Sequence, residues 1–163
     1  MRIDRRALFG LGGVGLLGGA ALLFGERTSY AREGRFEVDL SDAEWKKRLT
    51  PQQYAVLRGE NTERARSSPL DKEKRRGLYV CAGCGLPLFS SDAKFDSGTG
   101  WPSFWKPLPN AIGIRPDNSF FMKRTEVHCR RCGGHIGHVF DDGPRPTGKR
   151  YCMNGVAMRF IAA

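Results

Sequence analysis

Two short cysteine motifs constrain this chain more than any other feature. C81-A-G-C84 and C129-R-R-C132 share one spacing, and each is followed directly by a glycine, Gly85 or Gly133. Two residues between cysteines let a tight turn direct both sulfurs at one point, and the glycine tolerates a left-handed conformation after it. The pattern therefore predicts a structural Zn²⁺, one per chain, with four thiolate ligands: Cys81, Cys84, Cys129 and Cys132.

The first 31 residues differ from the rest of the chain. Arg5 and Arg6 precede an uncharged, glycine-rich apolar run over residues 7–24, which resembles a bacterial twin-arginine export signal. Small residues before a cut after Ala31 predict that residues 1–31 are a cleaved signal peptide that engages the export machinery and the membrane. An uncleaved membrane anchor is the alternative. Either interpretation places the domain of residues 32–163 outside the cytoplasm, in the periplasm of a bacterium.

Export bears on the paired cysteines, because disulfides form readily outside the cytoplasm. A disulfide within each CxxC pair is therefore the alternative to zinc. The twin-arginine route carries folded proteins, so zinc would load before export, and this favours the metal site. Four thiolates leave no coordination position for water, so such a zinc would hold the fold together and take no part in a reaction.

The rest of the chain suits one mainly β domain. S41-D-A-E44 and T50-P-Q-Q53 fit helix capping boxes, so two short helices are expected near the N-terminus. The charged stretch over residues 64–76 reads as a solvated connector. Short β-type runs broken by turn residues then predict an antiparallel sheet pair or a barrel. The inward helix candidates are Trp45, Leu49, Tyr54 and Leu57, and the predicted strands span 78–80, 87–89, 111–114, 119–122, 136–140, 150–154 and 156–161.

The fifth cysteine, Cys152, stands alone in R150-Y-C-M-N154. In a strand Arg150, Cys152 and Asn154 would share one face. A guanidinium beside a thiol favours the thiolate, which is the nucleophilic form. The alternative is an inert cysteine in a core strand.

Two further stretches carry polar or aromatic groups suited to a site. G133-G-H-I-G-H-V-F140 offers His135 and His138, which a straight strand would send to opposite faces, although Gly137 permits a bulge that brings them together. S97-G-T-G-W-P-S-F104 is a glycine-rich loop that presents Trp101. Each histidine taken alone is also compatible with a structural role, and Trp101 with a core anchor.

Together these motifs resemble the methionine sulfoxide reductase B family. The resemblance rests on residues 98–104, 134–144 and 150–155 and on the two CxxC pairs, in a consistent order over roughly residues 40–161. It implies two antiparallel β-sheets in a tent-like or sandwich-like arrangement with short N-terminal helices and the zinc remote from the reaction. Residues 32–163 would then form the catalytic domain of a peptide-methionine (R)-S-oxide reductase.

The resemblance also implies a role for each site residue. Cys152 would attack the sulfur of the sulfoxide and become a sulfenic acid. His138 and His135 would hydrogen-bond and help to protonate the departing oxygen. Asn154 would orient this group or its water, and Trp101 would form a wall against the substrate methyl, with Arg150 also at the substrate.

One position departs from the family's common pattern. Many members have a second, resolving cysteine in the loop before Trp101, where this chain has Thr99. With four cysteines assigned to zinc, no second thiol remains for Cys152. An external thiol is therefore expected to resolve the sulfenic acid, either a thioredoxin-like protein or a small thiol. The substrates would be oxidised proteins, peptides or free methionine sulfoxide.

Other classes of function are compatible with parts of the sequence. A zinc-scaffolded protein-binding module would need the four paired cysteines but neither Cys152 nor the two histidines. The formal net charge of +10 would suit nucleic acid, but an exported protein would not meet nucleic acid outside the cytoplasm. The basic residues also lack the interleaved aromatic residues of a nucleic-acid-binding surface. No nucleic-acid partner is therefore expected.

Overall fold

The computed structural model describes residues 36–119 and 123–163. The predicted signal peptide or anchor of residues 1–31 lies outside this part, and so do residues 120–122 of one predicted strand. Within the described ranges, no helix combines the length and the apolar character needed to cross a membrane.

Two short helices open the described part of the chain, as their capping sequences predict. In α1 (Asp42–Arg48) the Ser41 side chain accepts from the Glu44 N–H while Glu44 binds the Ser41 backbone, and Thr50 and Gln53 repeat the arrangement at α2 (Pro51–Leu57). These reciprocal bonds satisfy backbone donors that helices this short would otherwise leave to water. Of the predicted inward residues Trp45, Leu49 and Leu57 are buried, while Tyr54 is half-buried with its hydroxyl on Asp42.

The remainder is mainly β, with nine strands in the described residues. The predicted runs at 78–80, 87–89, 111–114, 136–140, 150–154 and 156–161 all correspond to strands, although the last begins with the 3₁₀ turn η4 (Gly155–Ala157). The strands that were not predicted are the one that ends at Cys129 and the two-residue strands at 94–95 and 103–104. The strands are β1 Gly77–Cys81, β2 Pro87–Ser90, β3 Lys94–Phe95, β4 Ser103–Phe104, β5 Ile112–Asp117, β6 Arg124–Cys129, β7 His135–Phe140, β8 Arg150–Met153 and β9 Met158–Ala162.

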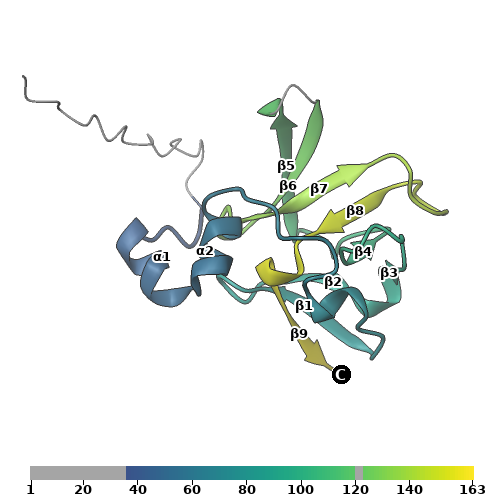
Figure 1. Cartoon of the computed structure of the whole chain (residues 1–163), viewed down its shortest axis with the longest axis horizontal. Helices are drawn as coiled ribbons and strands as arrows, with labels where there is room; N and C mark the ends of the chain where they lie inside the picture. Colours follow the sequence, from purple (N-terminus) through teal and green to yellow (C-terminus); the bar gives the residue numbers. More distant parts are fainter. Residues whose placement is uncertain (1–35, 120–122) are drawn as a thin grey trace, which may run out of the picture. The chain divides into compact units, whose positions relative to one another are not determined.

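The strands form two antiparallel sheets, which confirms the predicted fold class. One sheet has the order β2-β1-β9, and the larger one has the order β3-β4-β8-β7-β6-β5 (Figure 1). Neighbours along the chain pair in most places, but β8 lies between β7 and β4, so a strand from late in the sequence enters the middle of the larger sheet. This insertion brings the lone cysteine beside both the histidine strand and the end of the glycine-rich loop.

Aromatic side chains pack the two sheets together. Phe89 of β2 stacks on Phe104 of β4 with ring centroids 4.4 Å apart, and Tyr79 of β1 meets the edge of Phe104 at 4.9 Å. All three rings are fully buried. Burial of a large aromatic side chain stabilises a fold by about 2–3 kcal/mol, so this contact holds β4 and its neighbour β8 against the smaller sheet.

Candidate active site and metal site

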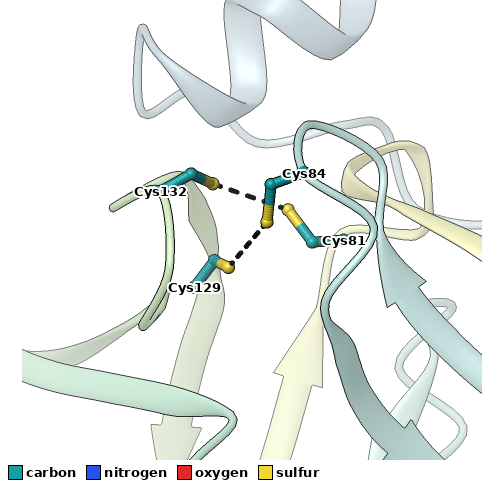
Figure 2. A group of neighbouring side chains, drawn as sticks. All are labelled: Cys81, Cys84, Cys129 and Cys132. Carbon is teal, nitrogen blue, oxygen red and sulfur yellow. Dashed lines mark hydrogen bonds between the residues drawn. The ribbon is translucent and has the colours of Figure 1, made fainter. Parts of the chain in front are cut away.

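The four paired cysteines converge on one point. Their sulfur atoms all lie within 4.8 Å of one another, and the contacts run across the two motifs (Figure 2). Cys81 and Cys132 have sulfurs 3.7 Å apart, and those of Cys84 and Cys129 are 3.5 Å apart. A disulfide needs about 2 Å, so all four thiols are free. Four sulfurs around a tetrahedral Zn²⁺ with Zn–S bonds of about 2.3 Å would be separated by about 3.8 Å, so this cluster fits zinc.

The two cysteine turns have the same backbone hydrogen bonds. Gly85 donates to the Cys81 carbonyl at 2.8 Å, and Gly133 donates to the Cys129 carbonyl at 2.8 Å. Both glycines have positive φ, at 76° and 64°, as the motif predicts. Cys81 ends β1 in the smaller sheet and Cys129 ends β6 in the larger one, so a metal held here would join the two sheets.

The lone cysteine lies in the centre of the larger sheet. Cys152 on β8 is directly opposite Ser103 of β4 on one side and His138 of β7 on the other. Residues directly opposite in an antiparallel pair carry their side chains on the same face, with Cβ atoms about 5 Å apart. A thiol, a hydroxyl and an imidazole therefore share this face, and the thiol is half-buried.

Hydroxyl groups of the glycine-rich loop extend this arrangement. The Thr99 Oγ1 atom lies 3.8 Å from the Cys152 Sγ atom. Ser97 bonds Thr99 at 2.8 Å and Ser103 at 2.7 Å, and Ser103 donates to the Trp101 carbonyl at 3.2 Å. A continuous chain of hydroxyl groups thus connects the loop to the cysteine sulfur.

A bulge brings the two histidines to the same side of β7. Val127 of β6 faces Gly137, whereas the next residue faces His135, so Ile136 is the additional residue. The His135 and His138 rings consequently lie with centroids 5.3 Å apart. This is the outcome that the sequence analysis allowed through Gly137.

Each imidazole is held by a carboxylate that the sequence analysis did not identify. His135 Nδ1 lies 2.8 Å from Glu126 Oε1, and His138 Nε2 lies 2.7 Å from Asp117 Oδ2. Because an ionised carboxylate only accepts, these ring nitrogens are the donors. In the described part of the chain, the buried His135 Nε2 atom has no hydrogen-bond partner.

The electrostatics of the His138 pair follow from burial and hydrogen bonding. Burial lowers the pKa of His138 below its usual 6.5, against the opposing effect of the hydrogen bond to Asp117. Burial opposes ionisation of Asp117, but hydrogen bonds from Ser119 and His138 and the charge of Arg124 outweigh it, so the pKa of Asp117 is lowered. The pair is therefore a neutral imidazole beside a carboxylate at neutral pH.

Arg150 precedes Cys152 on β8, and Asn154 follows directly after the strand. The Arg150 guanidinium forms two 2.8 Å bonds to the Asp142 carboxylate and lies over the Phe140 ring. The bond to Asp142 raises the pKa of Arg150, burial opposes this, and the charge of Cys152 adds to the rise. Arg150 is thus a permanent cation near the thiol. The Asn154 side chain is buried, and its amide donates to the Ile136 carbonyl at 3.0 Å.

Trp101 is anchored by Glu63, which lies between α2 and the charged stretch of residues 64–76. Its indole N–H donates to the Glu63 carbonyl at 3.1 Å, and its side chain is half-buried. Glu63 had no sequence signal, because it lies among polar residues. Glu126 and Asp117 carried none either, because each binds a histidine on β7, a strand further along the chain.

The fold and the site define a class: a two-sheet β domain with four clustered cysteines that fit a metal ion, and a separate cysteine beside two histidines that are each hydrogen-bonded to a carboxylate. Comparison with known proteins agrees. A family model for the SelR domain matches residues 49–162. The peptide methionine sulfoxide reductase MsrB of Leptospira interrogans is 53% identical over 126 residues, which are 77% of this chain and 96% of the relative.

Relatives from other organisms carry the same family name. The MsrB of Methanosarcina barkeri is 56% identical over 124 residues, covering 76% of this chain and 87% of the relative. The chloroplastic peptide methionine sulfoxide reductase B1 of Arabidopsis thaliana is 54% identical over 126 residues, covering 77% of this chain and 62% of the relative. The chain therefore belongs to the methionine sulfoxide reductase B family.

Proposed function

We propose that this protein reduces methionine (R)-S-oxide in proteins and peptides to methionine, with the free amino acid as the alternative substrate. The observation that carries the proposal is the position of Cys152 directly across the ladder from His138, on a face that also presents Thr99. The other four cysteines lie together in a separate cluster, so Cys152 is the thiol available for chemistry. Family membership supports the same reaction.

The reaction begins with attack of the Cys152 thiolate on the sulfoxide sulfur. Attack forms an S–S bond as the oxygen takes up a proton. The hydroxyl group then passes to the Cys152 sulfur while the S–S bond and the substrate S–O bond break, which leaves Cys152 as a sulfenic acid and releases methionine. The sulfoxide sulfur is reduced by two electrons and the cysteine is oxidised by two. A sulfoxide oxygen leaves poorly without a proton, so His138 and His135 are assigned to supply and hold it.

The remaining site residues bind and orient the substrate. Trp101 forms the wall against the substrate methyl group, which suits an apolar ring on a loop held by its indole N–H. Asn154 orients the polar group or its water, since its amide retains one N–H and one lone pair beyond its two backbone bonds. Arg150, paired with Asp142, keeps a positive charge beside the thiolate.

An external thiol completes the cycle. The sulfenic acid condenses with a first thiol to a mixed disulfide and water, and a second thiol releases Cys152 and leaves as a disulfide. The side chain of the glycine-rich loop that contacts the sulfur is Thr99, which has no redox chemistry. We assign the reductant to a thioredoxin-like protein or a small thiol.

The metal site supports a structural zinc. Cys81, Cys84, Cys129 and Cys132 would hold it, and when bound it supplies a cross-link between the two sheets. The cluster has no histidine, carboxylate or open ligand position for hydrolytic chemistry.

We further propose that the enzyme acts outside the cytoplasm on proteins oxidised there. Support comes from the Arg5-Arg6 pair and the apolar run over residues 7–24. Fusing residues 1–31 to a reporter and replacing both arginines by lysine tests this. Export that depends on the arginine pair is expected; export that persists in the lysine variant contradicts the twin-arginine assignment.

The activity itself is tested with separated epimers of a dabsylated methionine sulfoxide and an oxidised protein, using dithiothreitol as reductant. Conversion of the R epimer and no conversion of the S epimer is expected. A purified, folded, metal-loaded protein that converts neither substrate overturns the proposal and leaves the zinc-scaffolded binding module.

A further inference from the structure

Glu63 lies in the segment between α2 and β1, which is called the connector below, and forms four hydrogen bonds, two of them to the site residues Trp101 and Asn154. Its backbone N–H donates to Asn154 Oδ1 at 2.9 Å, and its carbonyl accepts from the Trp101 indole at 3.1 Å. Its carboxylate accepts from the Gly155 N–H at 2.6 Å and from the Val156 N–H at 2.9 Å. One residue thus holds the tryptophan, the asparagine and the turn that follows the cysteine strand.

The carboxylate substitutes for a missing helix cap. The 3₁₀ turn η4 begins after Asn154, whose side chain forms no cap hydrogen bond, so the first N–H groups of the turn need another acceptor. Glu63 provides both oxygens from a distant part of the sequence. Burial raises the pKa of Glu63, while the bonds from Val156 and Gly155 oppose the rise. The side chain is therefore held in place by specific partners.

The connector lies in close contact with the turn. A Cβ atom on Gly155 would lie 2.1 Å from Ser68 Oγ and 3.3 Å from Glu63 Oε1, so the turn has no room for a side chain. A second contact holds the connector to the glycine-rich loop, where the Arg66 N–H donates to the Gly100 carbonyl at 2.7 Å. Glu63 therefore lies at the point where connector, loop and turn meet.

We propose that Glu63 is a positioning residue for the reductase site, which fixes the Trp101 indole and the Asn154 amide relative to Cys152. The inference rests on the proposed function. Glu63 touches neither the cysteine sulfur nor the histidines in the contacts described, so its effect reaches the substrate through Trp101 and Asn154. Weakening its carboxylate bonds is expected to reduce substrate binding more than the chemical step.

The test compares the wild-type protein with Glu63→Gln, which keeps the size of the side chain. A glutamine offers one acceptor and one NH₂ donor where two N–H groups converge, so one bond becomes a donor–donor contact. With an oxidised peptide and dithiothreitol, KM is expected to rise about tenfold and kcat to change less than about threefold. The rate of Cys152 alkylation by iodoacetamide is expected to stay at the wild-type value.

A matched control is Glu73→Gln, which removes a carboxylate from the same connector that pairs with Arg75 and contacts neither Trp101 nor Asn154. Its KM is expected to equal that of the wild type. Effects of Glu63→Gln and Asn154→Ala on KM are expected to be less than additive, because the Glu63 carboxylate holds the turn that directly follows Asn154 and therefore acts on the same amide group. All variants are assayed at a temperature where circular dichroism shows them folded.

Two outcomes overturn the inference. One is a Glu63→Gln variant with the wild-type KM. The other is a fall in kcat at unchanged KM, the result of a smaller folded population and not of a displaced binding group. Failure of the proposed function is distinct, because it would appear as an inactive wild-type protein whatever the residue at position 63.

Discussion

The Thr99 hydroxyl lies 3.8 Å from the Cys152 sulfur, in the place where a resolving thiol would need to be. Thr99 is also bonded to Ser97, which in turn bonds Ser103, the residue opposite Cys152 in the sheet. The glycine-rich loop is therefore positioned for contact with the reacting sulfur, and only the chemistry of the side chain prevents an internal disulfide.

This contact predicts the behaviour of Thr99→Cys. One turnover without reductant should leave the wild-type protein with a sulfenic acid, whereas the variant should form a disulfide between position 99 and Cys152, because the two atoms are already near bonding reach. Thiol titration and a non-reducing peptide map measure the difference. Thr99→Ser is the control and should form no disulfide. If Thr99→Cys also forms none, the loop and Cys152 do not approach each other as described.

The second prediction concerns the nucleophile. Cys152→Ser is expected to reduce sulfoxide reduction by at least about 1,000-fold, because a serine hydroxyl neither attacks sulfur effectively nor carries oxygen as a sulfenic acid. The half-buried site changes by one atom, so the melting temperature should remain close to the wild-type value. Retention of full activity would exclude Cys152 as the nucleophile.

The third prediction concerns the metal. Cys84→Ser removes one ligand of a cluster that joins the two sheets, so it should abolish stoichiometric zinc and lower the free energy of unfolding by more than about 3 kcal/mol. Metal analysis and chemical denaturation measure both effects. Cys152→Ser is the matched control and should bind one zinc. A wild-type protein that is pure, folded and free of zinc, with Cys81 and Cys84 in a disulfide, would contradict the metal assignment.

The fourth prediction is a pH effect at His138. Burial lowers its pKa and the Asp117 hydrogen bond opposes this, so Asp117→Asn should lower the pKa of His138 further. Protonated His138 is lost as pH rises through that pKa, so the limb of single-turnover activity that falls with rising pH should move to lower pH. NMR titration of the histidine measures the same shift directly.

The exposed carboxylate of Asp141, paired with Lys149, offers the control Asp141→Asn, which should leave this limb in place. A His138 pKa that is unchanged or raised in Asp117→Asn would refute the assignment of the pair. The sign also applies to stability. Between the lowered pKa of His138 in the folded state and its usual value of 6.5, the unfolded chain binds a proton at this histidine and the folded protein does not. The free energy of unfolding therefore decreases as pH falls from 6.5 toward the lowered pKa.

Local signals in the sequence predicted several elements correctly. Ser41 and Thr50 marked the starts of both helices, because a capping box is completed within four residues. Gly85 and Gly133 marked the two cysteine turns for the same reason, since a positive φ is a local requirement. The strand ending at Cys129 was missed because its apolar positions are few and a buried Glu126 interrupts them.

The sequence by itself determined the chemistry: four thiolates in two identical turns, one separate thiol, two histidines and a threonine in place of a second reactive cysteine. The tertiary structure decided which groups meet. Insertion of β8 between β7 and β4 set His138 and Ser103 on either side of Cys152, and a bulge at Ile136 brought His135 to the same side. Glu63, Asp117 and Glu126 joined the site through contacts between different elements of the fold. Such contacts depend on sheet order and register, and no local pattern encodes these because they are properties of strand pairing.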